Sequence, residues 1–141
     1  FSLIFEVVTE ADIIPFKVLK SKHLFCKINL NNLEAKFIID TGASNTCIDK
    51  NKIDHFKLVS NKDEIDVSGA GKEKLKVTPT KKSILSLNKI VLMKINVMLL
   101  DMSSINNSLK KENSIEVDGI LGADFLIKTK STINYKLNHH T

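Results

Sequence analysis

Alternating and continuous apolar stretches, separated by short polar turns, run through most of the chain. Alternation with a period of two is typical of strands that bury one face, and short continuous apolar runs are typical of strands buried on both faces. Strands are predicted on this basis at 16–20, 24–30, 34–39, within 77–100, and at 131–137.

Asparagine pairs supply the turn signals between these strands. Asn31-Asn32 separates two apolar runs, and Asn tolerates the positive φ angles that a two-residue hairpin needs. The pair predicts a hairpin whose second arm ends at Ile39, immediately before Asp40. Asn88-Lys89 is a similar candidate within 77–100, so that region has room for two or three strands.

Helical signals are few and short. Asp49 can cap a helix at 50–57, and Gly122 precedes a helical turn at 123–127. The polar segment 101–116 predicts a short helix flanked by loop. Because strands and helices do not alternate, the pattern favours a mostly β fold with one or two short helices.

Composition narrows the function classes. The length of 141 residues is typical of a single domain. The net charge is +5. All the fixed positive charge comes from lysine, scattered among Asp and Glu, and arginine is absent. Since base recognition favours arginine, nucleic-acid binding is not expected. No apolar run is long enough to cross a membrane, and no Cys/His pattern has metal-ligand spacing, so neither a membrane partner nor a metal is expected.

Two cysteines, Cys26 and Cys47, lie outside any redox or metal motif. Free thiols in a lysine-rich chain indicate a reducing compartment, so a cytoplasmic location is expected. Whether the two cysteines pair is left open by the sequence. The chain begins at Phe1 rather than Met, which leaves room for a longer precursor.

The candidate chemistry lies at Asp40. The apolar residues Phe37, Ile38 and Ile39 deliver this acid into a tight turn, Asp40-Thr41-Gly42-Ala43-Ser44. A carboxylate at the end of a buried strand is costly to desolvate unless it is hydrogen-bonded or has a function. A second signal, Gly119-Ile120-Leu121-Gly122-Ala123-Asp124, comes much later in the chain. Asp118 and Asp124 could serve as a second acid, but structural roles are expected for both: Asp118 before a turn, Asp124 as a cap or facing solvent.

These two segments together resemble the retropepsin-like aspartic proteases. The resemblance spans nearly everything from Leu24 to Leu137 and implies a closed acid-protease β-barrel that is active as a homodimer. It implies that Asp40 is catalytic, that Thr41 braces the active-site loop across the dimer axis, that Gly42 offers its N–H to the carboxylate, and that Ala43 and Ser44 border the cleft. Ile120, Leu121 and Gly122 would pack beneath that loop.

The resemblance also implies a mobile flap. Small residues stand about thirty positions after Asp40 in Ser68-Gly69-Ala70-Gly71, and they would cover a peptide substrate. The distance from Asp40 to Ile120 exceeds that of the compact viral enzymes, so 101–116 is interpreted as an insertion. The expected organisation is an N-terminal extension at 1–14 followed by a protease domain at 15–141.

One Asp-Thr-Gly per chain fixes the expected mechanism. Aspartic proteolysis needs two acids that share a proton and activate a water, so the partner of Asp40 would be Asp40 of a second copy. The expected function is an aspartic endopeptidase that acts on peptides without a cofactor. A dimeric peptide-binding module of the same fold with little turnover is the alternative, and a self-processing protease within a longer polyprotein is a further reading.

Overall fold

The computed structural model describes residues 2–8, 13–61, 65–68 and 74–138, with side chains described within 13–61 and 76–133. Its strands are β1 (Ser2–Val8), β2 (Ile13–Val18), β3 (Leu24–Leu30), β4 (Leu33–Ile39), β5 (Cys47–Asp49), β6 (Ile65–Ser68), β7 (Lys74–Pro79), β8 (Ser83–Leu87), β9 (Ile90–Ile95), β10 (Met98–Leu100), β11 (Gly119–Leu121) and β12 (Thr132–Asn138). The helices are the 3₁₀ turn η1 (Lys50–Lys52), α1 (Ser103–Asn113) and α2 (Ala123–Lys128).

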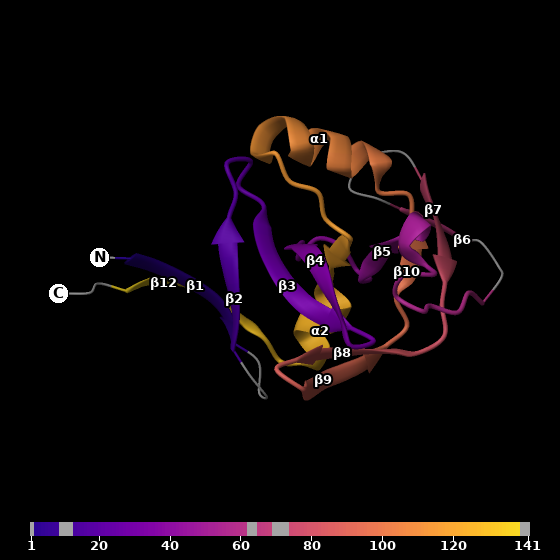
Figure 1. The fold of residues 1–141 in the computed structure, drawn as a ribbon, viewed down its shortest axis with the longest axis horizontal. Coiled ribbons are helices and arrows are strands. Elements are labelled where there is room, and N and C mark those ends of the chain that lie inside the picture. The colour runs from indigo at the N-terminus through magenta and orange to yellow at the C-terminus, as the bar shows by residue number, and fades with distance from the viewer. Residues whose placement is uncertain (1, 9–12, 62–64, 69–73, 139–141) are drawn as a thin grey trace.

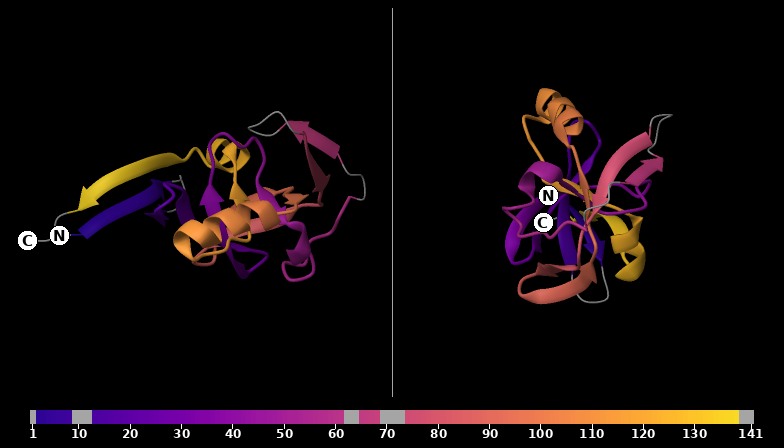
Figure 2. Two further views of the ribbon diagram at one scale, coloured as in Figure 1. Left: turned by 90° about the horizontal axis from the view of Figure 1, so that it is seen from above. Right: turned by 90° about the vertical axis from the view of Figure 1, so that its right-hand side faces the viewer.

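The strands form a single curled sheet, a half-barrel, with the helices on its outside (Figure 1). The strand order is β12-β1-β2-β3-β4-β11-β5-β10-β7-β6, and the β8–β9 hairpin attaches to β3. This mostly β architecture with two short α-helices agrees with the prediction. β1 and β12 pair along their whole length and extend together away from the body, as Figure 1 and the left view of Figure 2 show.

The predicted hairpin turns are confirmed. Asn31 and Asn32 adopt φ angles of 50° and 67°, and Asn88 and Lys89 adopt 51° and 67°. Two successive positive φ angles match the right-handed twist of the flanking strands, so each pair joins adjacent antiparallel strands. The first hairpin, β3–β4, is the support on which Asp40 is carried.

Apolar residues pack on both faces of the sheet. Phe37 and Ile39 of β4 belong to the main core, whereas Ile38 belongs to a second cluster covered by Leu109 of α1. This explains why the last three residues of β4 are all buried, although Leu33 to Lys36 alternate. The segment 101–116 therefore contains the expected helix, and that helix seals one face of the sheet.

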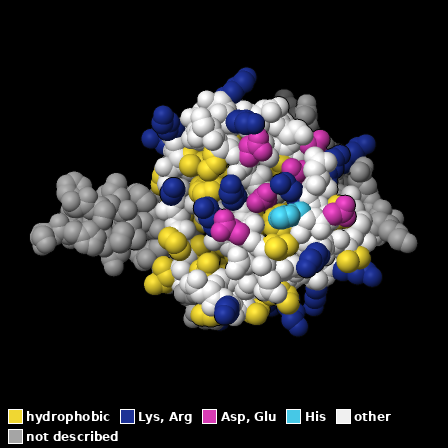
Figure 3. Space-filling model, in the orientation of Figure 1, with side chains coloured by type: hydrophobic (Ala, Val, Ile, Leu, Met, Phe, Trp, Pro, Cys, Tyr) yellow, Lys and Arg dark blue, Asp and Glu magenta, His cyan; other side chains and the backbone are white. Residues whose placement is uncertain are grey.

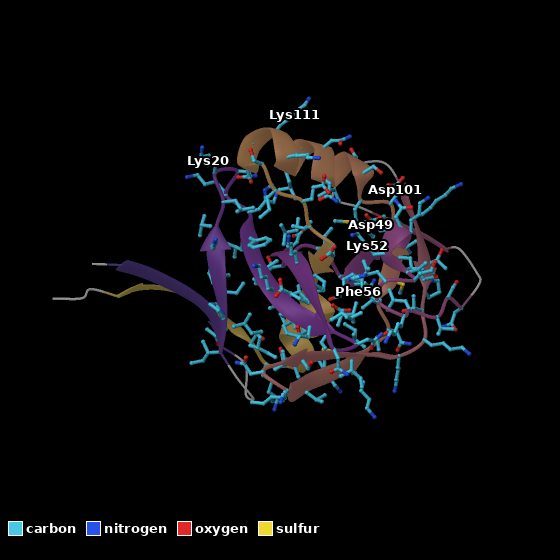
Figure 4. All side chains as sticks on the ribbon, in the orientation of Figure 1. Lys20, Asp49, Lys52, Phe56, Asp101 and Lys111 are labelled. Atoms are coloured by element: carbon cyan, nitrogen blue, oxygen red, sulfur yellow. The ribbon has the colours of Figure 1, made fainter. Side chains whose placement is uncertain are left out.

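The predicted helix at 50–57 is wrong in its length. Asp49 does cap it, by accepting the N–H of Asn51 at 3.1 Å, but only the 3₁₀ turn Lys50–Lys52 forms. The chain then turns so that Phe56 enters the main core, and its carbonyl accepts the side-chain amide of Asn31 at 2.8 Å. Asp49, Lys52 and Phe56 mark this region in Figure 4. Burial of one aromatic ring outweighs the weak preference for a longer helix.

The N-terminal region contributes strands to the same sheet. β1 pairs with β2 as well as with β12, so residues assigned to the extension at 1–14 are continuous with the sheet of the main body. The boundary at residue 15 stays a prediction. Among the described residues, no helix is both long enough and apolar enough to cross a membrane.

Candidate active site

Two parallel strands bring the two sequence signals together. β4 and β11 run side by side, with Ile39 opposite Leu121. Asp40 follows the first strand and Gly122 follows the second, and the N–H of Asp40 donates to the carbonyl of Leu121 at 2.9 Å. β5 lies on the other side of β11, so the segment between Asp40 and Thr46 arches over the end of β11. Three adjacent strands of the sheet, β4, β11 and β5, therefore hold the candidate loop.

Asp40 itself is exposed, and its carboxylate is oriented by its own loop. The N–H of Gly42 donates to Asp40 Oδ1 at 2.9 Å, and the N–H of Ala43 donates to the Asp40 carbonyl at 3.1 Å. A Cβ on Gly42 would lie 3.2 Å from Asp40 Oδ1, which is a tight contact. Thr41 and Ser44 are exposed beside the carboxylate. The loop thus presents one fixed carboxylate and neighbouring hydroxyl-bearing residues to solvent.

The start of α2 is bonded directly to this loop. The N–H of Ala123 donates to the carbonyl of Ala43 at 2.7 Å, and the N–H of Asp124 donates to the carbonyl of Ser44 at 3.2 Å. A helix N-terminus leaves N–H groups without partners inside the helix, and here the loop carbonyls accept them. A Cβ on Gly122 would lie 2.7 Å from the Ala43 carbonyl oxygen, so only glycine allows this approach.

A buried network joins the far end of the loop to α2. Thr46 is fully buried, and its hydroxyl donates to Asp124 Oδ1 at 2.7 Å while it accepts the N–H of Gly122 at 3.1 Å. The N–H of Thr46 donates to Asp124 Oδ2 at 3.0 Å. Asp124 therefore has the expected structural role: its carboxylate is bonded to Thr46, at the far end of the Asp40 loop. Sequence reasoning missed Thr46, because nothing local marks a threonine whose partner lies 78 positions away.

The other acidic candidate, Asp118, is also a structural residue. Its Oδ2 accepts the N–H of Lys36 at 2.8 Å, and its own N–H donates to the Lys36 carbonyl at 2.7 Å. These bonds tie the segment before β11 to β4. Within the part of the chain that the structure describes, Asp118 and Asp124 are both occupied by backbone bonds to the scaffold, so neither stands beside Asp40 as a ready second acid.

The predicted flap falls partly outside the described residues. Ser68 ends β6, which pairs with β7 from Ile65 opposite Val77 to Ser68 opposite Lys74. Gly69, Ala70 and Gly71 lie outside the described residues. The arms of a hairpin are therefore present at the predicted place. The roles of Ser68 and the three residues that follow it stay predictions.

The two cysteines are free thiols. Burial raises the pKa of Cys26 to about 12. Burial, together with the negative charge of Asp124, raises the pKa of Cys47 to about 11. A thiol must ionise to act as a nucleophile, so Cys47 is not a catalytic candidate at ordinary pH although it lies next to the loop. No group of three or more potential metal ligands occurs among the described residues.

Comparisons with known proteins agree with this geometry. The model of the family described as aspartyl protease matches residues 26–125. No curated protein sequence matches the chain significantly. The EIAV protease in complex with the inhibitor HBY-793 superposes with a TM-score of 0.54 at 16% identity, covering 80% of this chain and 93% of its own. The retroviral protease-like domain of Ddi1 from Leishmania major gives a TM-score of 0.52 at 13% identity, with coverages of 82% and 90%.

At these identities the two superpositions establish a shared fold, whereas the family match spans most of the chain, including both the Asp40 loop and the Gly122 turn. The protein therefore belongs to the aspartyl protease family.

Proposed function

We propose that this protein is an aspartic endopeptidase whose catalytic unit is a homodimer, with Asp40 of each copy as the catalytic acid. The observation that carries the proposal is the exposed Asp40 carboxylate, fixed by the Gly42 N–H at 2.9 Å on a loop that the scaffold holds at both ends. Preorganised carboxylates on a rigid support are what water activation requires.

Because the chain has only one Asp-Thr-Gly sequence, the second acid of the proposed site would come from a second copy. In the dimer the two Asp40 side chains would share one proton across a two-fold axis. The ionised carboxylate would accept a proton from a water, and the protonated one would donate to the oxygen of the scissile carbonyl. The water oxygen then bonds to the carbonyl carbon. As that intermediate collapses and the C–N bond breaks, the carboxyl that took the water's proton would donate it to the leaving amine nitrogen, and the other carboxylate would take back a proton from a hydroxyl of the intermediate. No cofactor takes part in this sequence.

The neighbouring residues take supporting roles in the proposal. Thr41, exposed beside Asp40, would brace the two loops across the axis, and Ala43 and Ser44 would border the cleft. The β6–β7 hairpin would cover an extended peptide, whose backbone could pair with it as an added strand. Ile120, Leu121 and Gly122 would support the loop from beneath.

The test is cleavage of a peptide library at mildly acidic pH. The wild-type protein should cleave, and Asp40→Asn should abolish cleavage while leaving the fold intact. Asp54→Asn is the matched control, since Asp54 is another exposed aspartate, at a turn outside the loop. Retained cleavage in the Asp40 variant would remove that residue from the mechanism.

Mixing the two forms tests the shared site. When equal amounts of wild-type and Asp40→Asn subunits exchange, about a quarter of the dimers keep two acids. Activity per wild-type subunit should therefore fall by about half on mixing, whereas independent single-chain sites would leave it unchanged. The alternative, a dimeric peptide-binding module, predicts binding of a hydroxyl-bearing peptide mimic of the tetrahedral intermediate without cleavage of any library member.

A further inference from the structure

A groove on the outer face of β2, β3 and β4 is unrelated to the Asp40 loop. It has a volume of about 380 Å³ and is lined by Pro15, Lys17, Phe25, Lys27, Lys36 and Ile115, among others. Lys17 stands opposite Phe25, and Lys27 stands opposite Lys36, so these side chains share one face of the sheet. Figure 3 shows apolar and lysine side chains mixed on the face that α1 borders.

One wall of the groove is held in place by two reciprocal pairs of hydrogen bonds. Asn106 of α1 donates its side-chain amide to the Val117 carbonyl at 3.1 Å and accepts the Val117 N–H at 2.8 Å. Asp118 and Lys36 exchange a second pair, at 2.8 and 2.7 Å. Ile115 lies on the segment that these bonds hold against β4.

The residues that line the groove include three lysines and no acidic residue. Glu34 pairs with Lys27 at 3.8 Å, Glu116 pairs with Lys110 at 2.7 Å, and Asp118 pairs with Lys52 at 3.8 Å. Each acid near the groove thus has a lysine within ion-pair distance. Lys17 and Lys36 are exposed and form no ion pair within 4.0 Å with any described residue. Lys36 is near enough to Glu116 for its charge to help lower the pKa of that carboxyl, but Glu116 has its ion pair with Lys110.

The geometry of these two lysines, neither of which forms an ion pair with a described residue, suggests the shape of a ligand. They lie two strands apart and are offset by two residues, which places their Cα atoms about 12 Å apart for ordinary strand spacings. Two carboxylates at positions i and i+4 of an extended peptide are separated by about 13 Å, and residue i+2 points to the same side. That middle residue would lie over β3 between Phe25 and Lys27, and Phe25, which is 4% exposed, forms the apolar floor.

We propose that this groove binds an extended acidic segment of a protein partner, with an apolar side chain flanked at two residues on either side by Asp or Glu. An acyl chain fits less well, because a shallow groove of this volume would leave most of a long chain in water. The site goes beyond the proposed catalysis and does not depend on Asp40.

The experiment measures binding of the peptide acetyl-Ser-Glu-Thr-Leu-Thr-Glu-Ser-amide to the Asp40→Asn protein by NMR titration. The expected result is saturable binding with shifts at β2, β3 and Ile115. Lys17→Gln with Lys36→Gln should weaken it at least about tenfold, as should replacing both Glu of the peptide by Gln, because each removes the paired charges. Replacing the peptide's Leu by Ser should also weaken it.

Lys81→Gln with Lys94→Gln is the matched control, since it removes the same charge from exposed positions outside the groove. An equal loss of affinity in this control would show nonspecific attraction and overturn the proposal. No saturable binding at millimolar peptide would do the same. Binding of phosphatidylglycerol vesicles through Lys17 and Lys36, without binding of the peptide, would replace the protein partner by a lipid surface.

Discussion

The hydroxyl of Thr46 donates to the carboxylate of Asp124 at 2.7 Å, and this bond connects two segments that lie far apart in the sequence. The same hydroxyl accepts the N–H of Gly122, so one side chain serves both the carboxylate and the turn into α2. Because Thr46 and Gly122 are both buried, the Gly122 N–H could not turn to water if the hydroxyl were lost. The network therefore positions the Asp40 loop relative to the helix behind it.

Thr46→Val is expected to lower the free energy of unfolding by about 1–3 kcal/mol, because it leaves the buried Gly122 N–H and one carboxylate oxygen with a partner fewer. Valine has nearly the same shape, so the loss reports the hydroxyl rather than a cavity. Urea denaturation measures the change. Thr132→Val, at an exposed threonine, is the control and should have little effect. An equal stability for the Thr46 variant would show that the bond is dispensable.

Local patterns account for much of the sheet. The Asn31-Asn32 pair predicted the β3–β4 hairpin because positive φ angles are a property of the residues in the turn. The position of Asp40 at the end of β4 follows from the same hairpin. By contrast, the helix at 50–57 was predicted too long, since the sequence does not say that Phe56 turns into the main core.

The parts of the candidate site that local sequence patterns do not predict are long-range. The parallel pairing of β4 with β11 joins Ile39 to Leu121, and the hydroxyl of Thr46 joins α2. Thr46 precedes Cys47 and Ile48, and in that local sequence it has no feature that distinguishes it from an ordinary strand residue. Only the resemblance to a known family brought the two glycine-containing signals together before the structure did. The Thr46 network depends on which carboxylate lies within reach of the Thr46 hydroxyl, and that is set by the tertiary structure rather than by any local pattern.

Gly122→Ala is expected to displace the Asp40 loop. The new methyl group would lie 2.7 Å from the Ala43 carbonyl oxygen and 2.8 Å from Asn45, and both contacts are with backbone. The cost should be about 1–3 kcal/mol or more, as for other overpacked sites. Thermal unfolding and the cleavage assay report the two consequences. Ser44→Ala, on the exposed side of the same loop, should leave stability nearly unchanged; a Gly122 variant as stable as this control would contradict the close approach.

Asp124→Asn is expected to make Cys47 more reactive toward alkylation. The negative charge of Asp124 is the second contribution, after burial, that raises the pKa of Cys47 to about 11. Removing the charge should lower that pKa, so the alkylation rate should rise at lower pH, while burial keeps the pKa above its usual value. Mass spectrometry of iodoacetamide-treated protein across pH 7 to 10, roughly the range of an ordinary thiol, measures the shift. Asp54→Asn should leave the profile unchanged.

Lowering the pH should reduce the local stability of α1 before the whole chain unfolds. Hydrogen bonds from the Ser103 side chain and backbone lower the pKa of Asp101, and the hydrogen bond and charge of Lys110 lower that of Glu116. A carboxyl group whose folded pKa is depressed contributes stability above its unfolded pKa and loses it as the pH falls through the folded value. The ordinary values are 3.8 for Asp101 and 4.5 for Glu116, so the loss should begin just above pH 4 and continue below it.

Hydrogen exchange of α1 between about pH 3 and 6 measures this acid dependence. Asp101→Asn combined with Glu116→Gln should flatten it, because neither amide titrates and the stabilisation is then absent at every pH. Glu112→Gln is the matched control: Glu112 is exposed on the same helix and forms no ion pair with a described residue. A double variant with the same acid dependence as the wild type would place the titrating groups elsewhere. The proposed cleavage is also assayed at mildly acidic pH. Measuring cleavage by the double variant over the same pH range therefore separates the pH dependence of α1 stability from the pH dependence of activity.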